Sequence, residues 1–151
     1  MDIVKAARTT MGTIDLDPAT NEGNHTNANT FYTKNTNGLD KPWNGNVWLN
    51  PPYGKGFAAW MHKANAECAS GRAVQIICLI PVRTNAGWFQ SLGKLGISLC
   101  FPRSIKFING TTMLQSTTAA MMPNVVVYVG KKHREFAEAF REFGVVVRVT
   151  N

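Results

Sequence analysis

The sequence predicts an α/β fold, an open sheet of mixed or mainly parallel strands with flanking helices. Short apolar runs alternate along the chain with segments in which apolar residues recur at helical spacing. Residues 73–80 are apolar at nearly every position, which is typical of a strand buried on both faces of a parallel sheet. With 151 residues, of which 44% are hydrophobic, the chain can bury one substantial core. We therefore expect a single compact domain over residues 1–151.

The first half of the chain predicts two strands, two helices and a long polar loop. The expected elements are a helix over 3–10, a strand over 13–16, a strand over 46–49 and a helix over 56–70. The last of these rests on Phe57, Trp60, Met61 and Ala64, which stand at helical spacing after a glycine-rich turn. Residues 19–46 are rich in Asn, Thr and Gly and show little apolar periodicity, so they predict a loop, and long polar loops in compact domains are often functional.

The second half predicts further strands and two helices. The expected elements are a strand over 73–80, a loop and helix over 83–95, strands over 97–101, 105–108 and 125–129, a helix over 134–143 and a strand over 145–149. Gly144 is predicted to be the left-handed residue that ends the last helix. Asp17, Asn50 and Pro81 each follow a predicted strand. In an open α/β sheet this brings their loops to one edge, where ligands bind.

The segment Asn50-Pro51-Pro52-Tyr53 directly follows the predicted strand over 46–49. Two consecutive prolines stiffen the loop and remove two backbone donors, which leaves carbonyls free to accept hydrogen bonds from a ligand. The amide oxygen of Asn50 and the carbonyl of Pro51 can each accept a hydrogen from an exocyclic amino group, while Tyr53 stacks on the heterocycle that carries it. Read alone, the four residues are also compatible with a simple rigid turn. Adenine or cytosine is the ligand that this pattern favours.

Several separated motifs accompany this segment along the chain. In chain order they are Ile14-Asp15-Leu16-Asp17-Pro18-Ala19-Thr20, Phe31-Tyr32-Thr33, Asn37-Gly38-Leu39, Trp43-Asn44-Gly45, Asn50-Pro51-Pro52-Tyr53-Gly54, Trp60 and Lys63. In this order and spacing they resemble the phage-type DNA N6-adenine methyltransferase (Dam-like) family. The resemblance continues, with less specific motifs, through Leu79-Ile80-Pro81, Trp88-Phe89, Cys100-Phe101 and Ile105-Lys106-Phe107. It thus covers most of the chain.

The resemblance implies a Rossmann-like class I methyltransferase sheet, S-adenosylmethionine as cofactor and adenine N6 in DNA as the methyl acceptor. By the same resemblance, Asn50, Pro51, Pro52 and Tyr53 are the catalytic residues. The residues implied to line the cofactor pocket are Asp15, Asp17, Pro18, Asn37, Gly38 and Leu39. Members of the family usually carry an additional amino-terminal segment with a Thr-Pro step, whereas this chain begins only a helix before its first strand. We therefore expect a methyltransferase domain shortened at its amino terminus.

The net charge of +7, from 16 basic and 9 acidic residues, favours a polyanionic partner such as DNA. The basic residues are scattered, and a solvated surface accounts for many of them. Those that we expect to contact phosphate follow predicted strands or the proline-rich loop, and they are Lys55, Arg83, Arg103 and Lys106.

Cysteine usage and hydropathy bound the remaining classes. Cys68, Cys78 and Cys100 form no CxxC pair, so we expect reduced thiols and no metal site. The chain shows no secretory signal and no apolar stretch of membrane-spanning length, which predicts a cytoplasmic protein without a membrane partner. The family resemblance alone implies that a phage or prophage encodes it. The pattern does not indicate an oligomeric state or a recognition sequence.

Two other classes of function stay open at this point. The shortened amino terminus and the scarcity of glycine after Asp17 are compatible with a catalytically degenerate homologue that binds DNA or protein. An Asn-Pro-Pro-Tyr segment also suits an amino methyltransferase that acts on RNA or protein. Cofactor binding separates the first class from an enzyme, and competition between substrates separates the second.

Overall fold

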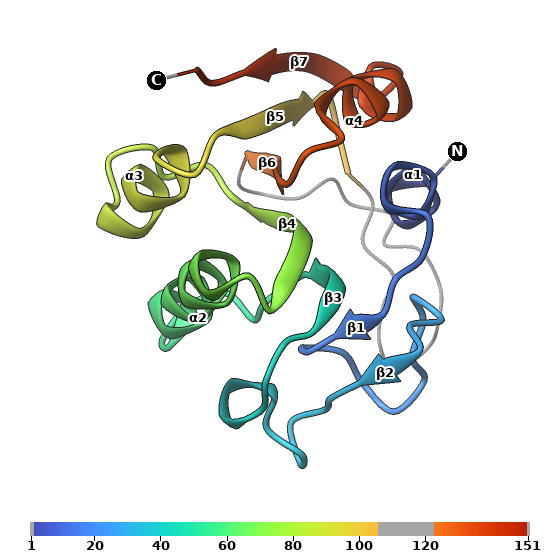
Figure 1. Ribbon diagram of the computed structural model, residues 1–151, viewed down its shortest axis with the longest axis vertical. Coiled ribbons are helices and arrows are strands. Elements are labelled where there is room, and N and C mark those ends of the chain that lie inside the picture. Colours follow the sequence, from blue (N-terminus) through green and yellow to red (C-terminus); the bar gives the residue numbers. More distant parts are fainter. Residues whose placement is uncertain (1, 106–122, 151) are drawn as a thin grey trace.

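The computed structural model describes residues 2–105 and 123–150, which form a seven-stranded mixed sheet with helices on both faces (Figure 1). The strand order is β2-β1-β3-β4-β6-β5-β7. The elements in chain order are α1 (Ile3–Met11), β1 (Leu16–Asp17), β2 (Thr30–Phe31), the 3-10 helix η1 (Gly38–Asp40), β3 (Gly45–Leu49), α2 (Phe57–Ser70), β4 (Ala73–Pro81), α3 (Gly87–Gly93), β5 (Ile97–Pro102), β6 (Asn124–Val129), α4 (His133–Phe140) and β7 (Gly144–Arg148). The predicted α/β class and mixed sheet are confirmed.

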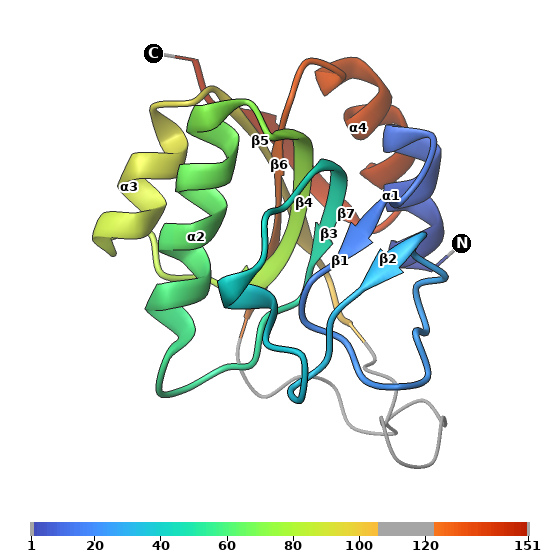
Figure 2. The same cartoon turned by 60° about the horizontal axis from the view of Figure 1, so that its bottom comes forward.

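Strand direction brings one set of loops to a single edge of the sheet. β2, β1, β3 and β4 are parallel to one another, and β6 runs antiparallel between β4 and β5. The carboxyl ends of β1, β3, β4 and β5 therefore lie at the same edge as the start of β6, at the bottom of Figure 2. This edge, called the carboxyl edge below, carries the loops after Asp17, Leu49 and Pro81, as the sequence predicts.

Two apolar cores lie on opposite faces of the sheet, and strand β4 contributes to both. Ile76, Cys78 and Ile80 pack toward α2 and α3, while Ile77 and Leu79 pack toward α1 and α4. Successive side chains on a strand point to opposite faces, and helices cover both faces of the sheet, so all five side chains are buried. Figure 1 shows the two pairs of helices on the two sides of this strand. The central strand is thus a rigid base for the loop that follows Pro81.

The polar segment between β1 and β3 contains two short elements that the sequence does not predict, β2 and η1. Asparagines hold its turns: Asn24, Asn27 and Asn37 have φ values of 41°, 48° and 49°, in the left-handed region that Asn tolerates better than most residues. The Asn24 side chain also accepts from the backbone N–H of Ala28 and donates to the carbonyl of the same residue. The Asn-rich composition is therefore structural as well as polar.

Three further predictions need correction or lie out of reach. α4 ends at Phe140 rather than at residue 143, and Gly144 is not left-handed, because it opens β7 instead of ending the helix. A Cβ at Gly144 would lie 2.0 Å from the carbonyl oxygen of Phe101, so glycine is needed for the close approach of β7 to β5. Most of the strand expected over 105–108 lies outside the described residues, and Ile105 is not in a strand.

No helix within residues 2–105 or 123–150 has the length and apolar character needed to cross a membrane.

We predict that Gly144→Ala lowers the free energy of unfolding by about 1–3 kcal/mol, because the added methyl overlaps the Phe101 carbonyl and must push β7 away from β5. Urea denaturation measures this loss. Gly87→Ala is the matched control, since no atom of residues 2–105 or 123–150 lies within 4 Å of its added Cβ, and it is expected to be neutral or slightly stabilising. Equal effects of the two substitutions would contradict the steric account.

Candidate functional site

A pocket of about 790 Å³ opens at the carboxyl edge and is called the main pocket. The loops that follow β1, β2 and β3, together with η1 and the first turns of α2, form its walls. Its lining residues are Pro18, Ala19, Thr20, Thr33, Lys34, Asn37, Gly38, Asn50, Pro51, Pro52, Tyr53 and Trp60. The main pocket thus unites the whole predicted Asn-Pro-Pro-Tyr segment with three of the residues predicted for the cofactor.

The Asn50–Tyr53 loop places an aromatic ring at the rim of the main pocket. Tyr53 is 39% exposed, and its ring meets Phe57 edge-on at a centroid distance of 5.9 Å. The hydroxyl donates to the carbonyl of Leu79 at 3.3 Å and accepts from Asn124 Nδ2 at 2.8 Å. Burial of the hydroxyl end raises the pKa of Tyr53 to about 12, so the phenol remains protonated at neutral pH. The ring is therefore fixed at one end and still accessible to a planar ligand.

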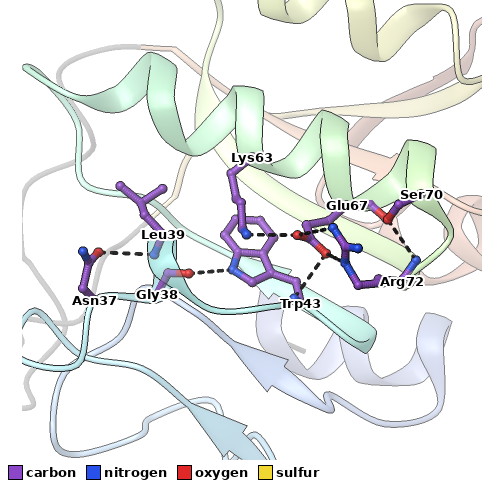
Figure 3. Close-up of polar contacts among 8 residues, drawn as sticks. All are labelled: Asn37, Gly38, Leu39, Trp43, Lys63, Glu67, Ser70 and Arg72. Atoms are coloured by element: carbon purple, nitrogen blue, oxygen red, sulfur yellow. Dashed lines mark hydrogen bonds and ion pairs between the residues drawn. The ribbon is translucent and has the colours of Figure 1, made fainter.

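Gly38 forms a wall of the main pocket against the loop after β1. A Cβ at this position would lie 2.0 Å from the carbonyl oxygen of Pro18, so only glycine permits this approach of η1. The carbonyl of Gly38 accepts from Trp43 Nε1 at 2.9 Å (Figure 3). Asn37 is the N-cap of η1, and its side chain accepts from the backbone N–H of Leu39. The position of this wall is thus set by a steric fit on one side and an indole hydrogen bond on the other.

Behind Trp43 lies a carboxylate that is only 1% exposed, that of Glu67 on α2 (Figure 3). It accepts from the backbone N–H of Trp43 at 3.3 Å. Arg72 donates to both of its oxygens, at 2.7 and 3.1 Å, and Lys63 pairs with it at 2.9 Å. Hydrogen bonds from Arg72, and then from Lys63 and Trp43, lower the pKa of Glu67 to about 2 against the cost of burial. The buried anion is therefore fully paired.

Trp60 connects the Trp43–Glu67 interaction to the main pocket. Its ring stacks on Trp43 at a centroid distance of 6.1 Å, while Lys63 Nζ lies 6.0 Å from the Trp43 ring centroid. Large aromatic residues beside apolar strands usually belong to the core. Trp43 and Trp48 are buried as expected, whereas Trp60 is half-buried and also lines the main pocket.

Asp17 faces a second space of about 650 Å³, called the rear pocket, on the side of the sheet that α1 covers. Its carboxylate accepts from Thr26 Oγ1 at 2.7 Å and from the backbone N–H of Ala19 at 3.3 Å. Burial raises the pKa of Asp17 to about 6. The other lining residues are Asp2, Ile3, Val4, Lys5, Arg8, Ala19, Thr20, Asn21, His25, Thr26, Asn27, Trp48, Asn50, Leu79 and Ile105. Ala19, Thr20 and Asn50 belong to both pockets, so the two spaces meet at Asn50.

Asp15 and Leu39 do not line either of these pockets. The Asp15 carboxylate accepts from the backbone N–H of Asn46 at 2.9 Å, from Thr13 Oγ1 at 3.0 Å and from Asn29 Nδ2 at 3.2 Å. These bonds join the entry of β1 to β3. The cofactor contacts predicted for Asp15 and Leu39 stay predictions, while the carboxylate of Asp15 has a clear structural task.

Thr33 is a lining residue that no pattern in the sequence singles out, although it lies in the motif Phe31-Tyr32-Thr33. It is 7% exposed and lines the main pocket, and its Oγ1 is buried without a hydrogen-bond partner in the described part of the chain. Both ring nitrogens of His25, in the rear pocket, are in the same condition. Buried polar atoms are nearly always paired, so atoms of this kind beside a pocket are candidates for a ligand contact.

Exposed basic side chains stand on the loops of the carboxyl edge. Lys55 follows β3, Arg83 follows β4 and Arg103 follows β5. Lys106, the fourth predicted phosphate contact, lies outside the described residues. Among residues 2–105 and 123–150, no group of three or more His, Cys, Asp or Glu side chains could hold a metal ion. The charge at this edge is thus positive around a pocket built from amides, carbonyls and rings.

The comparisons with known proteins give one family. A family model described as DNA N-6-adenine-methyltransferase (Dam) matches residues 1–148, nearly the whole chain. No curated protein matches this chain.

We predict that Glu67→Gln removes a contribution to stability that depends on pH. Because folding lowers the pKa of Glu67, the charged carboxylate stabilises the fold above its ordinary pKa, and this stabilisation is lost as pH falls from about 5 toward 2. The difference in unfolding free energy between wild type and variant should therefore approach about 3 kcal/mol at pH 7 and shrink below pH 4.

Denaturant unfolding at several pH values measures this difference. Glu138→Gln is the control, because Glu138 pairs with Arg134 on the exposed face of α4 and its removal should change stability little at any pH. A difference for Glu67→Gln that stays constant from pH 7 to pH 3 would refute the role of the buried charge.

Proposed function

The chain belongs to the DNA N-6-adenine-methyltransferase (Dam) family, and we propose that it transfers a methyl group from S-adenosylmethionine to the N6 amino group of adenine in DNA. The single observation that carries the proposal is the position of Asn50–Tyr53 at the junction of two pockets on the carboxyl edge. In this proposal the cofactor spans both pockets, and the acceptor base binds at the Asn50–Tyr53 loop beside their junction. A transfer between two ligands needs both of them to reach the same point, and Asn50 is that point.

We also propose that the sheet is of the Rossmann-like class I methyltransferase type, in one domain over residues 1–151. Two features support this assignment. The strands β2, β1, β3 and β4 form a parallel half, and the antiparallel β6 is inserted between β4 and β5. Ligand loops at the carboxyl ends of the parallel strands agree with the general rule for open α/β sheets.

The residues of the main pocket fit the adenosyl part of the cofactor. The volume of about 790 Å³ is in the range of small-molecule sites. Thr33 Oγ1 is a buried polar atom without a hydrogen-bond partner in the described part of the chain. Gly38 approaches the Pro18 carbonyl closely, and Asn37 and Asn50 are among the lining residues. In this proposal Pro18, Thr33, Asn37 and Gly38 hold the adenosyl part. When bound, the cofactor supplies a methyl group on a sulfonium, whose departure as a neutral thioether requires no metal.

The rear pocket suits the amino-acid end of the same molecule. Asp17 offers a carboxylate that can accept from an ammonium group, and Lys5 and Arg8 of α1 place positive charge nearby for a carboxylate. Arg8 is itself held by a hydrogen bond to the carbonyl of Thr26. The opposite charges in one pocket match a zwitterion, which supports the division of the cofactor between the two spaces.

The Asn50–Tyr53 loop then binds the adenine that receives the methyl group. The Asn50 side chain and the Pro51 carbonyl accept from the exocyclic amino group, which turns the nitrogen lone pair toward the methyl group. Holding the reacting atoms in line supplies much of the acceleration. Because a stacked base cannot reach the pocket, the base must leave the duplex, and Tyr53 replaces part of its lost stacking. Lys55, Arg83 and Arg103 contact the phosphates, and solvent takes the released proton.

The test is nucleoside mass spectrometry of unmethylated DNA incubated with purified protein, with and without S-adenosylmethionine. We predict cofactor-dependent N6-methyladenine. Asn50→Ala should lower the rate at least about a hundredfold while DNA affinity is retained, because the reacting nitrogen loses its alignment. DNA binding without any modified base would favour the degenerate homologue instead. A methylated RNA or protein, with unmodified DNA, would favour an amino methyltransferase for another polymer.

A second prediction concerns the cofactor alone. Thr33→Val removes one hydroxyl without a change in shape, so the Kd for S-adenosylmethionine should rise about three- to tenfold, the value of one hydrogen bond. Isothermal titration calorimetry without DNA measures this change. Thr30→Val is the matched control, since Thr30 is an exposed residue of β2 that lies outside the main pocket. An unchanged Kd for Thr33→Val would exclude the proposed contact.

A further inference from the structure

The geometry points to Asn124 as a positioning residue for Tyr53, and this inference rests on the proposed methyl transfer. Asn124 is the first residue of β6, where it pairs in register with Pro81 of β4. It is 7% exposed, and its Nδ2 donates to the Tyr53 hydroxyl at 2.8 Å across 71 positions of sequence. Asn124 does not line either pocket. Any effect on the reaction must therefore pass through Tyr53.

The residue type at this position calls for an explanation. Residues 125–129 of β6 are Val, Val, Val, Tyr and Val, which favour a strand, whereas Asn is among the residues that strands disfavour. A buried amide in such a strand is costly unless it is hydrogen-bonded. The bond to Tyr53 supplies the compensation and gives the asparagine a task that an apolar residue could not perform.

The loop that carries Tyr53 needs such an anchor. Gly54 and Gly56, which follow the tyrosine, have φ values of 103° and 90°, and a Cβ at either one would meet no atom of the described residues within 4 Å. Within the described part of the chain, the loop is therefore loosely packed on that side. On the other side, the Tyr53 hydroxyl donates to the Leu79 carbonyl at 3.3 Å and accepts from Asn124, so it is tied to both β4 and β6. The two bonds fix the ring to the most deeply buried strands of the sheet.

Fixing the ring matters because a base stacks only on a ring of the correct orientation. A ring that is held before the base arrives loses no further conformational entropy on binding, and the base is presented to the reacting methyl at a defined angle. Without the amide of Asn124 the hydroxyl keeps one weaker bond, and the ring can turn about χ1 toward the open side of the loop. The expected defect is in turnover, with cofactor binding unaffected.

The experiment is a double-mutant cycle of Asn124→Leu and Tyr53→Phe, with kcat and KM for DNA methylation, the Kd for S-adenosylmethionine and the Tm as readouts. Each single variant should lower kcat about tenfold through misplacement of the ring, and the double variant should be no worse than either one. The Kd for the cofactor should stay within about twofold of wild type. Tyr53→Phe removes the same bond from the loop side, which tests the inference even if Asn124→Leu folds poorly.

Asn65→Leu is the matched control, because Asn65 is a half-buried amide that donates to Met61 and Trp88 carbonyls away from the main pocket. It should lower Tm without lowering kcat. Effects of Asn124→Leu and Tyr53→Phe that multiply to about a hundredfold would overturn the inference, as would an unchanged kcat for Asn124→Leu. Wild-type protein that methylates no DNA would instead overturn the proposed function, and with it the role of Asn124 in it.

Discussion

The main pocket depends on one buried carboxylate, that of Glu67. Without partners, a charge that is only 1% exposed would cost several kcal/mol, but Arg72, Lys63 and the backbone of Trp43 pair with it completely. The interaction joins α2 to the segment before β3. Through the indole of Trp43 it reaches the carbonyl of Gly38, which is a wall of the pocket. A polar network remote from the ligand space thus fixes the distance between η1 and α2.

The remaining walls follow a similar division between rigid support and polar rim. Residues 75–81 of β4 are buried on both faces, and a few polar bonds hold the loops of the carboxyl edge against this strand and its neighbours. Asp17 is held by Thr26, and Tyr53 is held by Leu79 and Asn124. Loop residues can therefore expose amides, carbonyls and an aromatic ring without being loose. Such preorganisation is what a reaction governed by alignment requires.

The sequence predicts the long elements of this fold well, because their periodicity or unbroken apolar character is strong. It does not predict β2 and η1, since two- and three-residue elements have no period and depend here on asparagine turns. The prediction for Gly144 is wrong for a different reason. This glycine permits a close approach between strands, and sequence alone cannot distinguish that role from a left-handed helix cap. Local signals fail where tertiary contacts decide.

The same limit applies within the site. The Asn50–Tyr53 loop is readable because its residue types and its place after a strand both point to amino-group binding. Asp15 and Asp17 are the same residue type two positions apart, yet Asp17 ends β1 and lines the rear pocket. Asp15 precedes the strand, and its carboxylate accepts hydrogen bonds from Asn46, Thr13 and Asn29. Neither Thr33 nor Asn124 carries a local signal in the sequence. Thr33 matters because the fold buries its hydroxyl without a partner in the described part of the chain, and Asn124 matters because its partner, Tyr53, is distant in sequence. The residues that position a site are thus harder to read than those that touch its ligand, since their partners are brought together only by the fold.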